Sequence, residues 1–161
     1  MRGKSLSLAL VVILVSTSTP VAAADLFAQA GWGEGHLHSY AMGAQQPLRW
    51  RTRLAGFNVR TYVELTLSRW LANPVDPTAE DRFTQLGAAP VLPLQRPMRS
   101  ANFFIDAGID ACVITPRFRL DSKRFSTEFN FGDQLGFGVQ FRRSALHEVS
   151  VRVQHLSALG T

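Results

Sequence analysis

The chain has 161 residues, a single cysteine and a formal net charge of +5 at pH 7. One cysteine excludes an internal disulfide, and therefore a small secreted fold held together by disulfides. Basic residues form no continuous run: Arg49, Arg51 and Arg53 alternate with other residues, so nothing indicates a nucleic-acid-binding protein. Alternating arginines suit either an anionic lipid surface or an ordinary solvated face, and the sequence leaves both open.

Residues 1–24 have the features of a secretory signal peptide. Arg2 and Lys4 supply the basic start, residues 6–15 the apolar segment, and alanines 22–24 the small residues expected at a cleavage site. The apolar segment is too short to cross a bilayer as a helix, and no later apolar run is long enough either. We therefore predict an exported protein with one domain, residues 25–161.

After residue 24 the sequence repeats one pattern, a run of alternating apolar and polar residues followed by turn residues. In the clearest run, Val63 and Leu65 lie on one parity and Glu64 on the other. A period of two is typical of a β-strand with one apolar and one polar face. Prolines 90, 93 and 97 predict a loop that interrupts strand pairing. Seven strands are expected, at residues 30–44, 48–58, 59–70, 82–94, 101–115, 127–141 and 148–157.

Short alternating segments separated by turns, in an exported chain, are typical of a transmembrane β-barrel. Lipid offers no water to unpaired backbone groups, so a sheet in a bilayer has to close on itself. Glu64, Asp106 and Asp110 would then face the lumen. A soluble periplasmic barrel or sandwich has the same alternation with its apolar face turned inward, and it remains the competing interpretation. The residues expected at the membrane interfaces are Trp32, Trp50 and Trp70.

Two residues at the end of the last predicted strand suggest a reaction. Valines 149, 151 and 153 share one parity, and His155 and Ser157 continue it. Both residues therefore project from the apolar face, where a base beside a hydroxyl nucleophile has no ordinary structural reason to lie. If the apolar face meets lipid, the expected substrate is a lipid.

Other residues that could bind a metal or a nucleotide have simpler explanations. His36 and His38 share a strand face, but two ligands without a third do not make a metal site. Gly132, Gly136 and Gly138 are followed by alternating residues rather than by a helix. We therefore expect them to relieve crowding in a narrow barrel instead of forming a dinucleotide fingerprint. No cofactor and no metal ion is expected.

Several short stretches of the chain have the order and spacing found in one enzyme family. They are residues 107–109, 125–127 and 131–138, the pair 147–148 with Arg152, and finally His155-Leu156-Ser157. In these motifs the chain resembles the lipid A 3-O-deacylase family (PagL type) of Gram-negative outer membranes. Upstream, Tyr40 with Gly43, and residues 64–65 with Trp70, are similar to the family but less specific.

The resemblance implies an all-β fold, an eight-stranded antiparallel barrel in the outer membrane, of which about seven strands are present here. It implies hydrolysis of the ester at the 3-position of lipid A by a Ser-His-Glu triad on the outside of the barrel, within the outer leaflet. Ser157 corresponds to the nucleophile, His155 to the base, and the turn containing Gly160 to the oxyanion donors. The implied partners are lipid A of lipopolysaccharide and the outer-membrane lipid.

The sequence departs from the family pattern at two points. Ala158 stands where the family has Asn, which removes one side-chain donor. The family's triad acid follows the point at which this sequence ends, and neither Glu148, by its parity, nor the lumen-facing Glu64 can replace it. We therefore expect a missing final strand, a seam between the first and last strands, and edges able to pair with a second copy in a homo-oligomer. A missing acid leaves an active and an inactive enzyme both open.

The sequence thus predicts a lipid A 3-O-deacylase-like esterase of the outer membrane. One alternative is a non-enzymatic small outer-membrane barrel with a structural or adhesive role, which would release no 3-hydroxy fatty acid from lipopolysaccharide. The other is a soluble periplasmic lipid-binding barrel, which would not fractionate with the outer membrane.

Overall fold

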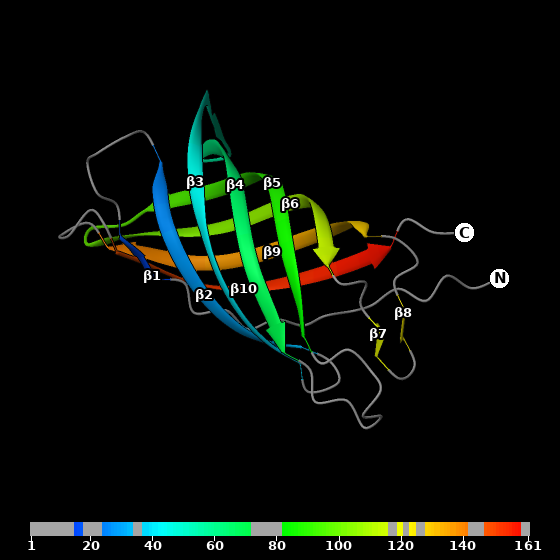
Figure 1. Ribbon diagram of the computed structural model, residues 1–161. Coiled ribbons are helices and arrows are strands. Elements are labelled where there is room, and N and C mark those ends of the chain that lie inside the picture. The colour runs from blue at the N-terminus through cyan, green and yellow to red at the C-terminus, as the bar shows by residue number, and fades with distance from the viewer. Residues whose placement is uncertain are drawn as a thin grey trace.

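The computed structural model is built almost entirely of antiparallel strands (Figure 1). It describes residues 15–17, 24–33, 37–71, 82–115, 119–120, 123–124, 128–141 and 147–158. The long strands are β2 (Asp25–Gly33), β3 (Leu37–Leu54), β4 (Phe57–Leu71), β5 (Arg82–Pro97), β6 (Ala101–Thr115), β9 (Phe129–Phe141) and β10 (His147–Ala158). The short ones are β1 (Val15–Thr17), β7 (Arg119–Leu120) and β8 (Lys123–Arg124), of which β7 and β8 pair only with each other. No helix in these ranges has the length and apolarity to cross a membrane.

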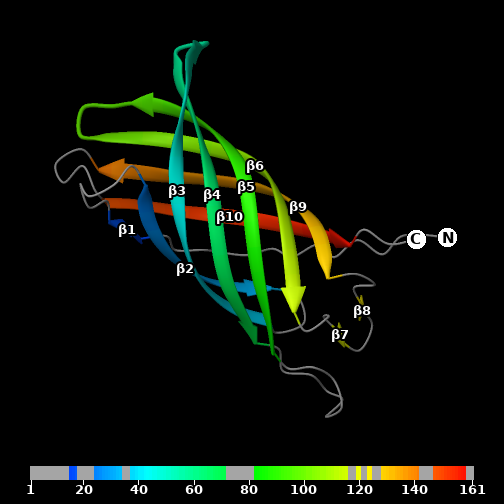
Figure 2. The same cartoon turned by 45° about the horizontal axis from the view of Figure 1, so that its top comes forward.

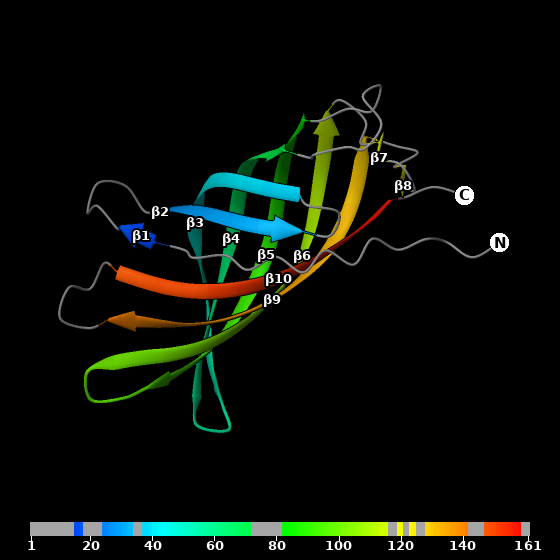
Figure 3. The same ribbon diagram turned by 90° about the horizontal axis from the view of Figure 1, so that it is seen from below.

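The seven long strands pair in the order β10-β9-β6-β5-β4-β3-β2 and curl into a half-barrel (Figures 2 and 3). The predicted number of long strands is confirmed, but the first two boundaries are wrong. The predicted run 30–44 is divided between β2 and β3, because the connection of residues 34–36 is too short to disturb the alternation. The predicted run 48–58 contains the β3–β4 turn, where Ala55 and Gly56 both have positive φ angles, of 48° and 84°. Alanine gives no sequence signal for such a turn.

The loop predicted at prolines 90, 93 and 97 is also wrong, because β5 continues through all three. Pairing of β5 with β6 lapses between Ala88 and Val91 and resumes in the same register. Pairing of β5 with β4 lapses between Val91, the partner of Tyr62, and Leu94, the partner of Val59, and likewise resumes in the same register. Each lapse lies beside one proline, which has no N–H to donate. Pro90 and Pro93 therefore each interrupt the pairing over two residues on one side without ending the strand.

The exposed outer face of the half-barrel is rich in apolar side chains, and most of the buried charged and amide side chains lie inside. On β9, Leu135 and Phe137 are exposed, whereas Gln134 between the glycines is buried. Glu64, Asp106 and Asp110 are buried inside, as predicted, and a soluble barrel would have the opposite arrangement. Of the tryptophans, Trp32 and Trp50 are exposed. Trp70 is not at the outer surface: it points inward and stacks on Phe83 with ring centroids 5.5 Å apart.

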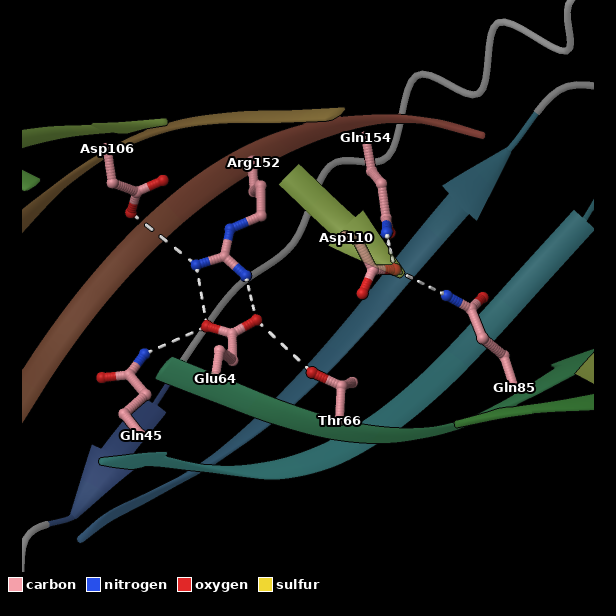
Figure 4. Close-up of polar contacts among 8 residues, drawn as sticks. All are labelled: Gln45, Glu64, Thr66, Gln85, Asp106, Asp110, Arg152 and Gln154. Atoms are coloured by element: carbon pink, nitrogen blue, oxygen red, sulfur yellow. Dashed lines mark hydrogen bonds and ion pairs between the residues drawn. The ribbon is translucent and has the colours of Figure 1, made fainter. Parts of the chain in front are cut away.

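A buried ion pair connects opposite walls of the barrel interior (Figure 4). The guanidinium of Arg152 on β10 donates to both carboxylate oxygens of Glu64 on β4, at 2.7 and 3.2 Å. Asp106 on β6 lies 3.7 Å from the same guanidinium. Gln45 and Thr66 donate to Glu64 at 3.3 and 3.4 Å. Since β4 and β10 are not neighbours in the sheet, this pair joins strands that the backbone ladder does not.

A second polar cluster lies further along the interior. The amides of Gln85 and Gln154 both donate to Asp110, at 3.3 and 3.1 Å (Figure 4). Glycines make room for these carboxylates. A Cβ atom on Gly136 would lie 2.6 Å from an oxygen of Asp106, and one on Gly87 would lie 2.8 Å from an oxygen of Asp110. The predicted role of Gly136 in relieving crowding is therefore confirmed.

The edges of the half-barrel, β2 and β10, do not pair with each other. β1 lies between them, with three residue pairs to β2 and the single pair Ser16↔Glu148 to β10. The predicted open seam is thus wrong for the full chain, because β1 completes a closed ring of paired strands. The physical reason is that unpaired edge groups accept any extended segment that reaches them. That segment belongs to residues 1–24, the predicted signal peptide.

Replacing Arg152 with Met should strongly destabilise the barrel, because Glu64 and Asp106 would remain buried without a cation. Removing one partner of a buried ion pair costs about 3–5 kcal/mol. We therefore expect a clearly lower urea midpoint for unfolding of the protein refolded in detergent micelles.

The matched control is Arg69→Met, because Arg69 is an exposed arginine on β4. Its loss should cost about 1 kcal/mol or less. Adding Glu64→Gln to Arg152→Met should recover part of the loss, because one unpaired charge is removed. An unchanged midpoint for Arg152→Met alone would show that the lumen pair does not hold the barrel together.

Candidate active site

His155 and Ser157 lie on the outer face of β10. Their neighbours of the same parity, Val149 and Val153, are exposed, whereas Arg152 on the other parity is buried in the lumen. The side chain of His155 is 31% exposed. The predicted orientation of both residues is therefore confirmed, and it follows from the period of two along a single strand.

The strand register places a carboxylate directly opposite the histidine. His155 on β10 pairs with Asp133 on β9, and its Nδ1 lies 3.1 Å from Oδ1 of Asp133. A carboxylate only accepts hydrogen bonds, so this contact favours the tautomer with the proton on Nδ1. The lone pair of Nε2 is then available to accept a proton. Asp133 and His155 thus form a carboxylate–imidazole pair on the outer surface.

The sequence analysis did not identify Asp133 as a site residue, although it belongs to the stretch 131–138 that carried the family resemblance. Two facts pointed to Asp133 as a site residue. Its parity on β9 is outward, and residues 142–146 connect β9 directly to β10. What the sequence lacked was the register, since a shift of one residue would turn the carboxylate to the lumen.

Ser157 lies two residues beyond His155 on the same face. Its hydroxyl donates to the backbone carbonyl of Phe131, its partner on β9, at 3.4 Å. The contacts of these described residues include no hydrogen bond between Ser157 and His155. Two residues along a strand span about 7 Å, and a rotation about χ1 of Ser157 would turn its hydroxyl away from that carbonyl. The hydroxyl of Ser157 and the imidazole of His155 therefore lie close together on one face without contacting each other.

Apolar side chains surround this polar group. Phe129 and Phe131 make an edge-to-face contact with ring centroids 5.0 Å apart, and both are exposed. Leu135 and Val153 extend the same outward surface toward the other end of the strands. The polar group therefore lies within an exposed apolar surface.

The remaining predicted site residues do not add to the group. Gly160, the predicted oxyanion residue, lies outside the described residues, as does His36. His38 is exposed on β3. Glu148 is at the opposite end of β10, and Glu64 is in the lumen, so neither contacts His155. Within the described part of the chain, no three His, Cys, Asp or Glu residues cluster in a way that could hold a metal ion.

The site lies at the end of the barrel where the connections include the longest ones. Residues 34–36, 72–81 and 116–128 connect strands at this end. At the other end the connections between the long strands are residues 55–56, 98–100 and 142–146. The two ends of the barrel are therefore distinct, and His155 and Ser157 lie near the end with the two long connections.

Comparison with known proteins agrees with this geometry. The family model for lipid A 3-O-deacylase (PagL) matches residues 38–161, which include Asp133, His155 and Ser157. The crystal structure of the outer membrane enzyme PagL superimposes with a TM-score of 0.68 at 21% sequence identity, covering 94% of this chain and 87% of that one. A search of curated proteins found no match. The family match extends over most of the sequence, and the chain belongs to the lipid A 3-O-deacylase (PagL) family.

Proposed function

We propose that the chain is an outer-membrane ester hydrolase that removes the acyl chain from the 3-position of lipid A. The observation that carries the proposal is the contact between His155 and Asp133, two residues from Ser157, on the apolar outer face of a barrel of this family. Polar side chains cost free energy on a lipid-facing surface, so a trio of them there favours a functional role, and the molecules that meet it are lipids.

The position of the site supports lipid A as the substrate. In bacterial outer-membrane barrels the longer connections are extracellular and the short turns periplasmic. His155 and Ser157 lie near the end with the long connections 72–81 and 116–128. The site would therefore open into the outer leaflet, which is where lipopolysaccharide is found. The proposed function requires no ligand from the periplasm and no nucleic acid.

The proposed reaction is acyl transfer to Ser157 followed by hydrolysis. The Nε2 atom of His155 accepts the hydroxyl proton as the oxygen attacks the ester carbonyl, and Asp133 stabilises the imidazolium that forms. Backbone N–H groups of residues 158–160, including Gly160, would bind the oxyanion. His155 then returns the proton to the departing sugar oxygen, and a water molecule activated in the same way releases the fatty acid. The residues themselves supply every proton transfer, so the mechanism uses no metal and no cofactor.

Ser157→Ala and His155→Ala should each abolish release of 3-hydroxy fatty acid from lipopolysaccharide in mixed micelles. Nucleophile and base act as a unit, so each single loss should lower kcat by roughly the same large factor, on the order of 10³ or more. The control is Val149→Ala, an exposed residue on the same strand and face, which should retain activity. A protein that fractionates with the outer membrane yet releases no fatty acid before mutation would favour the non-enzymatic alternative.

Asp133→Asn should lower kcat by about 10³–10⁴-fold while KM stays close to that of the original protein, since Asp133 acts on the imidazole and not on the lipid. Asp133→Glu should recover part of the rate. Asp25→Asn, at the start of β2, provides a matched loss of one carboxylate away from the site. Full activity of Asp133→Asn would mean that another group orients His155.

We also propose that residues 1–24 are removed on export, which would take β1 away from the edges of β2 and β10. Two unpaired edges in lipid favour pairing with another strand. Protein that begins at residue 25 should therefore form a homodimer in detergent, as measured by light scattering, whereas the full chain should stay monomeric. A compact monomer whose gel mobility changes on heating would contradict this part of the proposal.

A further inference from the structure

The β3–β4 hairpin extends beyond the rest of the half-barrel (Figures 1 and 2). Pairing of β3 with β2 ends at Gln45, and β3 then bulges between Pro47 and Arg51 before the Ala55–Gly56 turn. The hairpin lies at the opposite end of the strands from His155 and Ser157. Its residues are therefore not part of the site described above.

Three arginines of this hairpin share one face. Arg51 and Arg60 are direct cross-strand partners, and Arg53 lies two residues further along, opposite Asn58. All three arginines are exposed. Arg53 donates to the side chain of Asn58 at 3.1 Å. None of the three forms an ion pair with a carboxylate in the described part of the chain.

Like charges placed directly opposite on two strands repel each other and destabilise the pairing. The hairpin nevertheless places Arg51 against Arg60. An open hollow of about 440 Å³ adjoins the pair, lined by Arg51, Thr52, Arg53, Asn58, Val59 and Arg60. A solvated anion in this hollow would remove the repulsion. The guanidinium fork matches the oxygens of a phosphate in particular, because it offers two parallel donors.

The other features of the hairpin are apolar. Leu54 and Phe57 pair on the face opposite the arginines. Leu54 is 62% exposed and Trp50, in the bulge, is 55% exposed. An element with a cationic face and an exposed apolar and aromatic face is suited to a membrane interface, where acyl chains and phosphates lie side by side. A free phosphate ion would leave these apolar groups without a partner.

We propose that the arginine face of the β3–β4 hairpin, formed by Arg51, Arg53 and Arg60, binds the phosphate of an anionic phospholipid headgroup. The acyl chains of neighbouring lipids lie against Leu54, on the opposite face of the hairpin, and against Trp50 in the bulge. By the distribution of connections, this end of the barrel corresponds to the periplasmic leaflet, which is opposite to the leaflet of the proposed reaction. The site is independent of the deacylase function, and its contacts involve none of Asp133, His155 and Ser157.

Isothermal titration of the full chain in uncharged detergent micelles tests this proposal. The probes are short-chain phosphatidylglycerol, short-chain phosphatidylcholine and inorganic phosphate. We expect saturable binding of phosphatidylglycerol, at least tenfold tighter than that of the zwitterionic lipid and of inorganic phosphate. High salt should weaken binding, because the contacts are exposed charges.

The double variant Arg51→Gln/Arg60→Gln should bind phosphatidylglycerol at least tenfold more weakly. Its melting temperature without lipid should be unchanged or higher, because the repulsion between the two arginines is removed. A merely structural role would instead lower it. Arg51→Lys/Arg60→Lys keeps the charge but not the fork and should bind with intermediate affinity. The control Arg69→Gln, an exposed arginine near the other end of β4, should stay within twofold of the original protein.

Three results would overturn the proposal. Equal affinity for the two lipids would show an ordinary solvated face. Unchanged binding by the double glutamine variant would place the lipid elsewhere. Inorganic phosphate bound as tightly as phosphatidylglycerol would identify a site for the free ion and not for a lipid.

Discussion

The ion pair between Arg152 and Glu64 determines much of this structure. It joins β10 to β4 across the interior, where Asp106 adds a second carboxylate to the same guanidinium. The two carboxylates can be buried in this way because the guanidinium lies between them and because glycines such as Gly136 leave them space. With these polar residues concentrated inside, the outward positions of the strands are left mainly to apolar residues. The family's lipid-facing exterior is thus the consequence of a polar interior.

The same pair fixes the orientation of the outer site. Arg152 holds one parity of β10 toward the lumen, so His155 and Ser157, on the other parity of the strand, have to point outward. The ladder to β9 then sets which residue lies beside the imidazole, and that residue is Asp133. The proposed catalytic group on the outside of the barrel therefore depends on an interaction on its inside, although no side chain of one touches the other.

Local periodicity made the orientation of His155, Ser157 and Glu64 predictable from the sequence, since a period of two needs no knowledge of the fold. What depends on pairing between strands was not predictable. Asp133 and His155 are 22 residues apart in the sequence, and only the register between β9 and β10 brings them together. The arginine face likewise depends on the β3–β4 register that places Arg60 opposite Arg51. The prolines in β5 wrongly predicted a loop for a related reason. The neighbouring strands on both sides keep the register of β5 where pairing is locally lost.

In the proposed reaction, the exposed pair of Asp133 and His155 would act at a lipid surface, and the surroundings of Asp133 bear on how it could do so. In water, an exposed carboxylate and imidazole attract each other only weakly, because solvent screens them. Asp133 has 76% of its side chain exposed in the isolated chain, so a lipid that covers this face removes most of that solvent. The attraction between carboxylate and imidazolium then increases as the local dielectric constant falls. Binding of the substrate would therefore itself strengthen the pair that activates Ser157, and the same hydroxyl would be a poor nucleophile when the face is uncovered.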